Sequence, residues 1–176
     1  MTNKVIFISD FFINEITGGA EFCNDALMNS LKHRFIFEQH KSQTVTPRFI
    51  KDNKECFFIV ANFFLLHEEC KKEMANVTYV IFEHDHKYIK SNNPALYKNF
   101  LAPESQIQNK TFYKNALAVI CQSDKHSKVV QKNLLLKNVV NSAGNIWTDE
   151  QLAILEKNLN AEKTIEFAVL NSQNRN

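Results

Sequence analysis

The sequence predicts an α/β protein with a Rossmann-like, doubly wound and mainly parallel sheet that carries helices on both faces. Short apolar runs alternate with segments of helical periodicity along the chain, and this alternation is typical of βαβ units. Several runs are continuously apolar, such as residues 57–61 (Phe-Phe-Ile-Val-Ala) and 118–121 (Ala-Val-Ile-Cys). Strands that are buried on both faces of a parallel sheet have this composition.

The expected elements follow one another in the order strand, helix, strand. Apolar runs predict strands over residues 5–12, 35–39, 56–61, 78–83 and 118–122. Apolar residues at helical spacing predict helices over residues 20–32, 65–75, 103–116, 123–135 and 148–159. Thr148, with Gln151 three residues later, forms a capping-box pattern at the start of the last helix, and Ser123 is the expected N-cap of the helix before it.

The length of 176 residues suits one domain with a substantial core. We expect that domain over residues 1–162. Residues 163–176 are expected to form a linker and the first strand, over 165–170, of a carboxy-terminal domain that the chain does not contain. The alternative is an edge strand with a frayed end, and such an edge could pair with a second copy to give a homodimer.

The net charge and the cysteine spacing limit the kinds of partner that the protein is expected to bind. The 21 basic residues nearly balance the 19 acidic ones, and a net charge of +2 predicts neither a nucleic acid nor a membrane as partner. The four cysteines are widely spaced and include no Cys-x-x-Cys pair, which argues against a zinc knuckle. The sequence shows neither a secretory cleavage pattern nor an apolar stretch of membrane-spanning length, so we expect a soluble, cytoplasmic protein.

Gly18 and Gly19 lie between the first expected strand and the first expected helix, directly before that helix begins. A glycine pair there provides either a positive φ or room for a close approach to the backbone. The amino end of a helix also favours an anion. Two interpretations remain open: a turn that holds a phosphate or another polar ligand, and a plain tight turn.

The densest polar cluster is Glu83-His84-Asp85-His86, directly after the fourth expected strand. Ligands of open α/β sheets bind outside the carboxyl ends of the strands. If the strand continued, His84 and His86 would point the same way, with Asp85 opposite. Three interpretations are open: a histidine that acts as acid, base or ligand contact, a metal-dependent hydrolase whose metal is held by His84, His86 and a weak third candidate, His126, and a solvated strand end.

Ser123 ends the next expected strand, so it lies at the equivalent place on the same edge of the sheet. Its hydroxyl could cap the following helix or contact a ligand. The sequence contains no Gly-x-Ser-x-Gly elbow, which argues against a nucleophilic serine. It also lacks a Walker A motif and a Gly-x-Gly-x-x-Gly fingerprint, which argues against a P-loop ATPase and a standard dinucleotide fold.

These segments together resemble the amino-terminal domain of GT-B-fold retaining glycosyltransferases of the group 1, or family-four, type. The matching pieces are Thr17-Gly18-Gly19-Ala20-Glu21 after the first strand, His84-Asp85 after the fourth and Ser123 after the fifth. The resemblance covers about residues 4–170 in order and spacing. It implies an enzyme that transfers a sugar from a nucleotide-sugar donor to an acceptor of unknown identity.

The resemblance also implies roles for individual residues. His84 would be the catalytic residue that helps to position the transferred sugar, and Gly18 and Gly19 would keep the first turn close to the donor phosphate. It implies no metal cofactor, because protein groups and helix dipoles would stabilise the leaving diphosphate. The remaining expected substrate contacts are Glu21, Asp85, His86 and Ser123.

One departure from the family is large. The second domain of such enzymes holds most of the nucleotide-binding residues, and nothing after Leu170 can supply them. We therefore expect that this chain alone lacks transferase turnover. The segment from Glu83 to Tyr97 is also richer in polar residues than the family's usual pair, which indicates an acceptor of its own. The competing hypothesis is a non-catalytic Rossmann-like module for binding or assembly.

Overall fold

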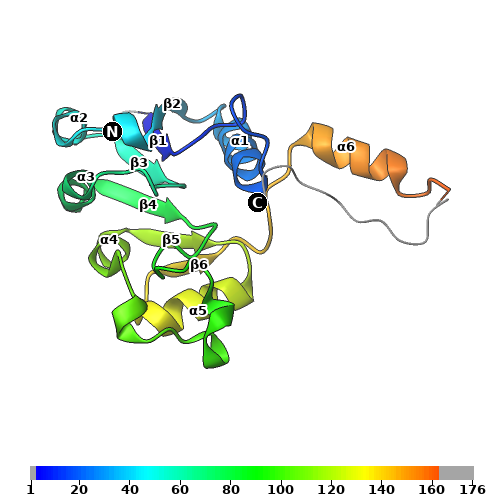
Figure 1. The fold of residues 1–176 in the computed structure, drawn as a ribbon. Coiled ribbons are helices and arrows are strands. Elements are labelled where there is room, and N and C mark those ends of the chain that lie inside the picture. Colours follow the sequence, from blue (N-terminus) through cyan, green and yellow to red (C-terminus); the bar gives the residue numbers. More distant parts are fainter. Residues whose placement is uncertain (1–2, 163–176) are drawn as a thin grey trace.

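Six parallel strands form one sheet in the computed structural model, which describes residues 3–162 (Figure 1). Their order across the sheet is β2-β1-β3-β4-β5-β6, and each neighbouring pair is parallel. The strands are β1 (Lys4–Ser9), β2 (Ile36–Lys41), β3 (Phe57–Val60), β4 (Thr78–Phe82), β5 (Ala118–Cys121) and β6 (Val139–Asn141). This order places a topological switch point between β1 and β3, where the chain reverses its direction of winding.

Helices cover both faces of the sheet, as expected for a doubly wound fold (Figure 1). Cys23 and Met28 of α1 pack on one face with Phe7 and Phe82. The other face packs against α2, α3, α4 and α5. The helices are α1 (Gly19–Leu31), α2 (Pro47–Asp52), α3 (Glu68–Glu73), α4 (Lys110–Asn115), α5 (Asp124–Leu134) and α6 (Asp149–Asn158). The α/β class and the Rossmann-like doubly wound architecture are therefore confirmed.

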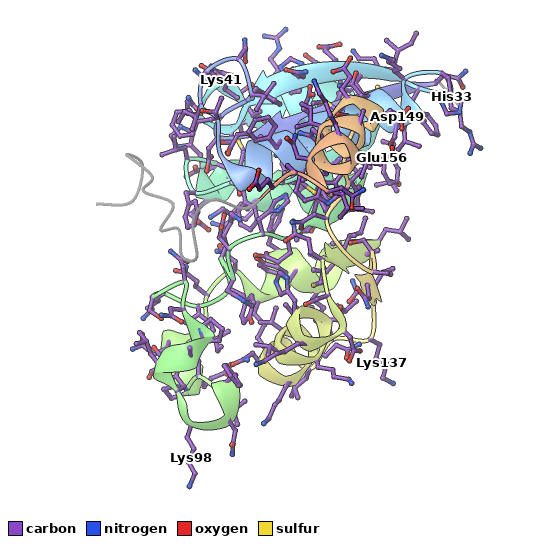
Figure 2. All side chains as sticks on the ribbon, turned by 90° about the vertical axis from the view of Figure 1, so that its right-hand side faces the viewer. His33, Lys41, Lys98, Lys137, Asp149 and Glu156 are labelled. Carbon is purple, nitrogen blue, oxygen red and sulfur yellow. The ribbon has the colours of Figure 1, made fainter. Side chains whose placement is uncertain are left out.

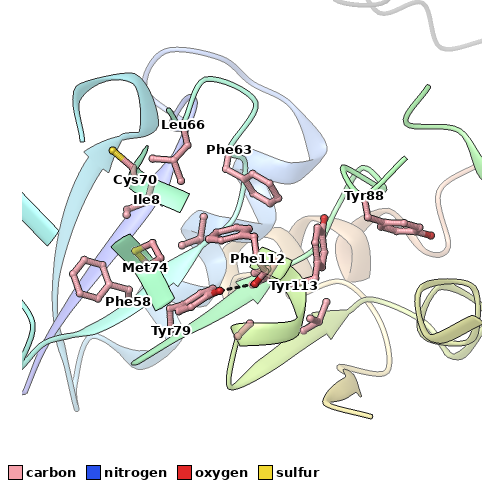
Figure 3. Close-up of a cluster of buried hydrophobic side chains, with 14 of the residues drawn as sticks. Ile8, Phe58, Phe63, Leu66, Cys70, Met74, Tyr79, Tyr88, Phe112 and Tyr113 are labelled. Atoms are coloured by element: carbon pink, nitrogen blue, oxygen red, sulfur yellow. Dashed lines mark hydrogen bonds between the residues drawn. The ribbon is translucent and has the colours of Figure 1, made fainter. Parts of the chain in front are cut away.

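The larger core lies between the sheet and α2 to α5, and aromatic rings fill its centre (Figure 3). Tyr79 and Phe112 stack with ring centroids 5.1 Å apart, and the Tyr79 hydroxyl donates a hydrogen bond to the carbonyl oxygen of Phe112. Phe63 meets Phe112 edge to face at 5.0 Å. Because the tyrosine hydroxyl finds a partner inside the core, these rings can be buried without leaving a polar group unpaired.

Two of the expected helices differ from those observed, and two observed elements were not expected. The helix expected over 103–116 is an α-helix only over Lys110–Asn115, because Asn109 just before it adopts a left-handed φ of 55°. The helix expected over 65–75 begins at Glu68. Strand β6 and helix α2 were not expected at all, and both are short. The strand expected over 165–170 and the linker over 163–176 lie outside the described residues.

The capping box expected at Thr148 is confirmed. The Thr148 hydroxyl accepts a hydrogen bond from the backbone N–H of Gln151, and the Gln151 side chain accepts one from the N–H of Thr148. None of the residues of the helix that it begins, α6, is buried. Over residues 3–162, no helix is both long and apolar enough to cross a membrane.

The larger core should depend on Phe58, whose side chain is fully buried in β3. Phe58→Ala is expected to lower the free energy of unfolding by about 3–5 kcal/mol, because it removes apolar contacts and leaves a cavity. Urea unfolding followed by circular dichroism measures the loss. Phe22→Ala, on the exposed side of α1 at 43% exposure, is the control and should stay within about 0.5 kcal/mol of the wild type. Equal losses in the two variants would contradict this description of the core.

Candidate functional site

Polar residues gather at the edge of the sheet where β1, β3, β4 and β5 end. Ile8 lies opposite Val60, Val60 opposite Ile81, and Ile81 opposite Val119, so the strands end at similar heights. The residues that follow these strands form two groups. We call Glu21, Asn24, Asn62, His84 and Gln122 the edge network, and we call the cavity bordered by His86, Asn93, Phe100, Ser123, Lys125 and His126 the histidine pocket.

The glycine pair does not provide a positive φ. Gly18 is the N-cap of α1 with an extended backbone, at φ −114° and ψ 164°. Its lack of a side chain instead makes room for Glu21: a Cβ on Gly18 would lie 2.3 Å from Glu21 Oε2, whereas one on Gly19 would meet nothing within 4 Å. The close approach that the sequence indicated is therefore made by the chain's own carboxylate, which sits favourably near the positive end of the helix dipole.

His84 is the centre of the edge network. Its Nε2 lies 3.0 Å from Asn24 Oδ1, and its Nδ1 lies 2.7 Å from Gln122 Nε2. An amide oxygen only accepts and an amide nitrogen only donates, so His84 is a neutral imidazole with its proton on Nε2. Burial, with a smaller effect from Lys87, lowers the pKa of His84 to about 4 and keeps the ring neutral at pH 7.

Three buried side chains in or next to the edge network keep a polar atom without a partner among residues 3–162. Asn62 Nδ2 donates to Glu21 Oε1 at 3.2 Å, but Asn62 Oδ1 has no donor. Asn24 Nδ2 has no acceptor, although its Oδ1 engages His84, and the Ser9 hydroxyl at the end of β1 is also unpaired. A buried polar atom that stays unpaired costs about 1–3 kcal/mol, so these atoms favour a small polar partner, such as an ordered water or a hydroxyl group.

His84 and His86 do not point the same way. Strand β4 ends at Phe82, and His86 adopts a left-handed φ of 53°, so the alternation of a strand stops before it. His86 Nδ1 lies 2.9 Å from the Tyr88 hydroxyl, and its ring centroid lies 4.5 Å from that of His126. This divergence contradicts a metal site shared by His84 and His86. Within residues 3–162, no three His, Cys, Asp or Glu side chains are arranged to hold a metal ion.

A buried ion pair lies on either side of His84 and His86 in the sequence. Glu83 and Lys87 are 0% and 1% exposed, and Lys87 Nζ lies 4.0 Å from Glu83 Oε1 and 3.2 Å from Asp85 Oδ2. Glu83 also accepts hydrogen bonds from the Tyr113 hydroxyl and, at 2.9 Å, from the backbone N–H of Asp85. Burial by itself would raise the pKa of Glu83, but Lys87 and Tyr113 outweigh it and hold the pKa below its usual value.

Asp85 occupies a position between the two groups and faces solvent. Its side chain is 48% exposed, and one carboxylate oxygen binds Lys87. Asp85 therefore makes an ion pair within the loop that follows β4, and this contact helps to hold the loop in place. Sequence reasoning placed Glu83 in the polar cluster but did not recognise Lys87 as its partner.

The histidine pocket has a volume of about 380 Å³ and lies between residues 92–100 and the first turn of α5. The Ser123 hydroxyl accepts a hydrogen bond from the N–H of His126 at 3.1 Å, which confirms Ser123 as the N-cap, and Ser123 also lines the pocket. Lys125 Nζ lies 4.6 Å from the centroid of the Phe100 ring. Sequence reasoning missed Lys125, and it considered His126 only as a metal ligand.

No protein-family model, curated protein or solved structure that was compared with the chain matches it. We therefore infer function from the edge network and the histidine pocket. Of the residues expected at the site, Glu21 and His84 belong to the edge network, and His86 and Ser123 line the pocket.

Acid should destabilise the fold because His84 and His86 resist protonation. Burial lowers both pKa values from 6.5 to about 4, so the unfolded chain binds more protons than the folded one between these values. The free energy of unfolding therefore falls as the pH drops from 6.5 toward 4, by at most about 1.4 kcal/mol per pH unit for each histidine.

Urea unfolding at several pH values tests this prediction. His84→Gln should show a shallower dependence on pH, because glutamine cannot take up the proton. His33→Gln is the control, since His33 is exposed after α1 and lies at the surface in Figure 2. A slope that His84→Gln leaves unchanged would exclude His84 as a source of the effect.

The contact between Gly18 and Glu21 can be measured separately. Gly18→Ala is expected to lower the free energy of unfolding by up to about 1 kcal/mol, because the new methyl group displaces the end of the Glu21 side chain, which accepts a hydrogen bond from Asn62. Gly19→Ala is the matched control and should be neutral or stabilising by up to about 1 kcal/mol. The cost of Gly18→Ala should shrink in a Glu21→Ala background. The same cost in both backgrounds would show that Glu21 is not the group displaced.

Proposed function

We propose that this chain is the acceptor-side domain of a GT-B-type glycosyltransferase that uses a nucleotide-sugar donor. The observation that carries the proposal is the edge network, in which a neutral His84 joins Asn24 of α1 to Gln122 after β5. Glu21 and Asn62 lie beside it at the switch point between β1 and β3. This is the part of a doubly wound sheet where ligands bind.

The chemistry of the edge network suits sugar hydroxyls. Asn24 Nδ2 is an unpaired donor and Asn62 Oδ1 an unpaired acceptor, and the Glu21 carboxylate can accept further hydrogen bonds. A hydroxyl group donates and accepts at once, so it can pair with both kinds of atom. The carboxylate of Glu21 would repel a phosphate at this turn, which supports a hydroxyl as the group that binds here.

The roles of the residues follow from their contacts. Both ring nitrogens of His84 are engaged, so we assign it the positioning of Asn24 and Gln122 beside the transferred sugar. A sugar hydroxyl would reach His84 itself by replacing one of these amides. In the proposed reaction the bond from the sugar C1 to the donor phosphate breaks, and the nucleoside diphosphate leaves with the electron pair. A bond from C1 to the acceptor oxygen forms, and the proton of the acceptor hydroxyl passes to the leaving diphosphate. We propose that a second domain binds the nucleotide of the donor and that the reaction uses no metal.

A second candidate function is a non-catalytic assembly module, and helix α6 favours it. Figure 1 shows α6 apart from the sheet, and its apolar side chains Leu152, Ile154 and Leu155 are 48–63% exposed. A monomer in light scattering at all concentrations would count against self-assembly through this helix.

Binding of nucleotide sugars and free hexoses, followed by two-dimensional NMR of the chain, tests the sugar site. We expect shifts at the side-chain amides of Asn24 and Asn62 and at the ring of His84. Asn24→Ala should weaken the binding of the best ligand about fivefold or more, because a buried hydrogen-bond donor is lost. Asn29→Ala, on the exposed side of the same helix, is the control and should bind normally. Shifts that avoid the edge network, or equal affinities in the two variants, would refute the proposed site.

A further inference from the structure

We infer that the histidine pocket is a subsite for a phosphate group. The inference deepens the proposed function and rests on it in one respect: a phosphate bound here would belong to the acceptor, which would therefore be a phosphomonoester. Three observations carry the subsite itself, namely the charge of its lining, the place of Lys125 and the two histidines beside it.

The charge of the pocket favours an anion. Its lining holds one charged group, the ammonium group of Lys125, together with two histidines that burial keeps neutral by lowering their pKa values, Ser123 and asparagines, but no carboxylate. Two acidic residues adjoin the lining in sequence. Asp124 directs its carboxylate to Lys128, with Oδ2 2.6 Å from Nζ, and Asp85, before His86, directs its carboxylate to Lys87, with Oδ2 3.2 Å from Nζ. The buried Glu83 is engaged by Tyr113 and Lys87. The carboxylates around the pocket therefore have partners of their own.

Lys125 is placed at the pocket by an aromatic ring. Its Nζ lies 4.6 Å from the Phe100 centroid, a distance typical of a cation–π contact. No carboxylate lies within 4.0 Å of this ammonium group in the part of the chain that the structure describes. Lys125 therefore keeps its hydrogen-bond donors for a ligand, and a phosphate oxygen is a strong acceptor for them.

The first turn of α5 adds further donors, and the two histidines lie beside it. His126 Nε2 is buried and has no hydrogen-bond partner among residues 3–162. His86 is fixed against Tyr88 through Nδ1, which orients its ring toward that of His126. The backbone N–H groups at the start of the 11-residue helix α5 lack partners within the helix, apart from the one that Ser123 caps. Such groups bind phosphate oxygens in many proteins.

The pocket and the edge network are adjacent along the chain. Gln122 binds His84, and the next residue, Ser123, lines the pocket. In the same way His84 belongs to the network and His86 to the pocket. The proposed acceptor would place a hydroxyl group in the network and its phosphate in the pocket.

Titration of the chain with inorganic phosphate, followed by NMR, tests the subsite. We expect shifts at His86, Ser123, Lys125 and His126. Lys125→Gln should weaken phosphate binding about tenfold, because a charge-assisted hydrogen bond is lost. The control is Lys98→Gln: Lys98 is exposed near the pocket loop and points away from the body of the molecule in Figure 2.

The outcomes are distinct from those of the sugar experiment. Phosphate shifts scattered over the surface lysines, or equal weakening by Lys125→Gln and Lys98→Gln, would overturn the subsite and leave the sugar site standing. Phosphate binding that Asn24→Ala leaves unchanged would support a subsite separate from the edge network. If phosphate binds in the pocket while no sugar binds in the network, the proposed function fails and the subsite survives. Lys125 is exposed, so its variant should fold, and circular dichroism checks that it does.

Discussion

The buried pair of Glu83 and Lys87 determines the geometry of the sheet's working edge. Glu83 follows β4 directly and receives hydrogen bonds from the Tyr113 hydroxyl and the Asp85 backbone, while Lys87 reaches back toward it from four residues on. Removing one partner of such a pair leaves an uncompensated buried charge and costs about 3–5 kcal/mol. Between these two anchors the chain makes a turn that sends His84 under α1 and His86 toward α5.

Each of the two groups at the edge combines residues that are distant in sequence. The edge network joins the first turns of α1 to the ends of β3, β4 and β5, and Asn24 and His84 are 60 positions apart in the sequence. The histidine pocket joins the turn after β4 to residues 92–100 and the start of α5. A parallel sheet makes both possible, because its strands all end at one edge.

The sequence allowed the central strands and the main helices to be predicted, because buried parallel strands such as 57–61 are apolar throughout. Strand β6 was not predicted, because it has only three residues, of which two are exposed. Helix α2 is too short for periodicity, although Thr46 before Pro47 marks its start. The positions of Glu21, His84 and Ser123 at one edge were predictable. The turn at His86 was not, because a histidine is only a weak local signal for a left-handed φ.

The Glu21 carboxylate, which lies next to Gly18, makes the two ends of this sheet edge differ in charge. An acidic group sits at the α1 end, while the ammonium group of Lys125 sits at the α5 end. A molecule that is neutral at one end and anionic at the other would therefore lie along the edge in only one of its two orientations. In the proposed transferase this polarity would select which hydroxyl of an acceptor faces the sugar, so that regiochemistry would follow from two charges at opposite ends of this edge of the sheet.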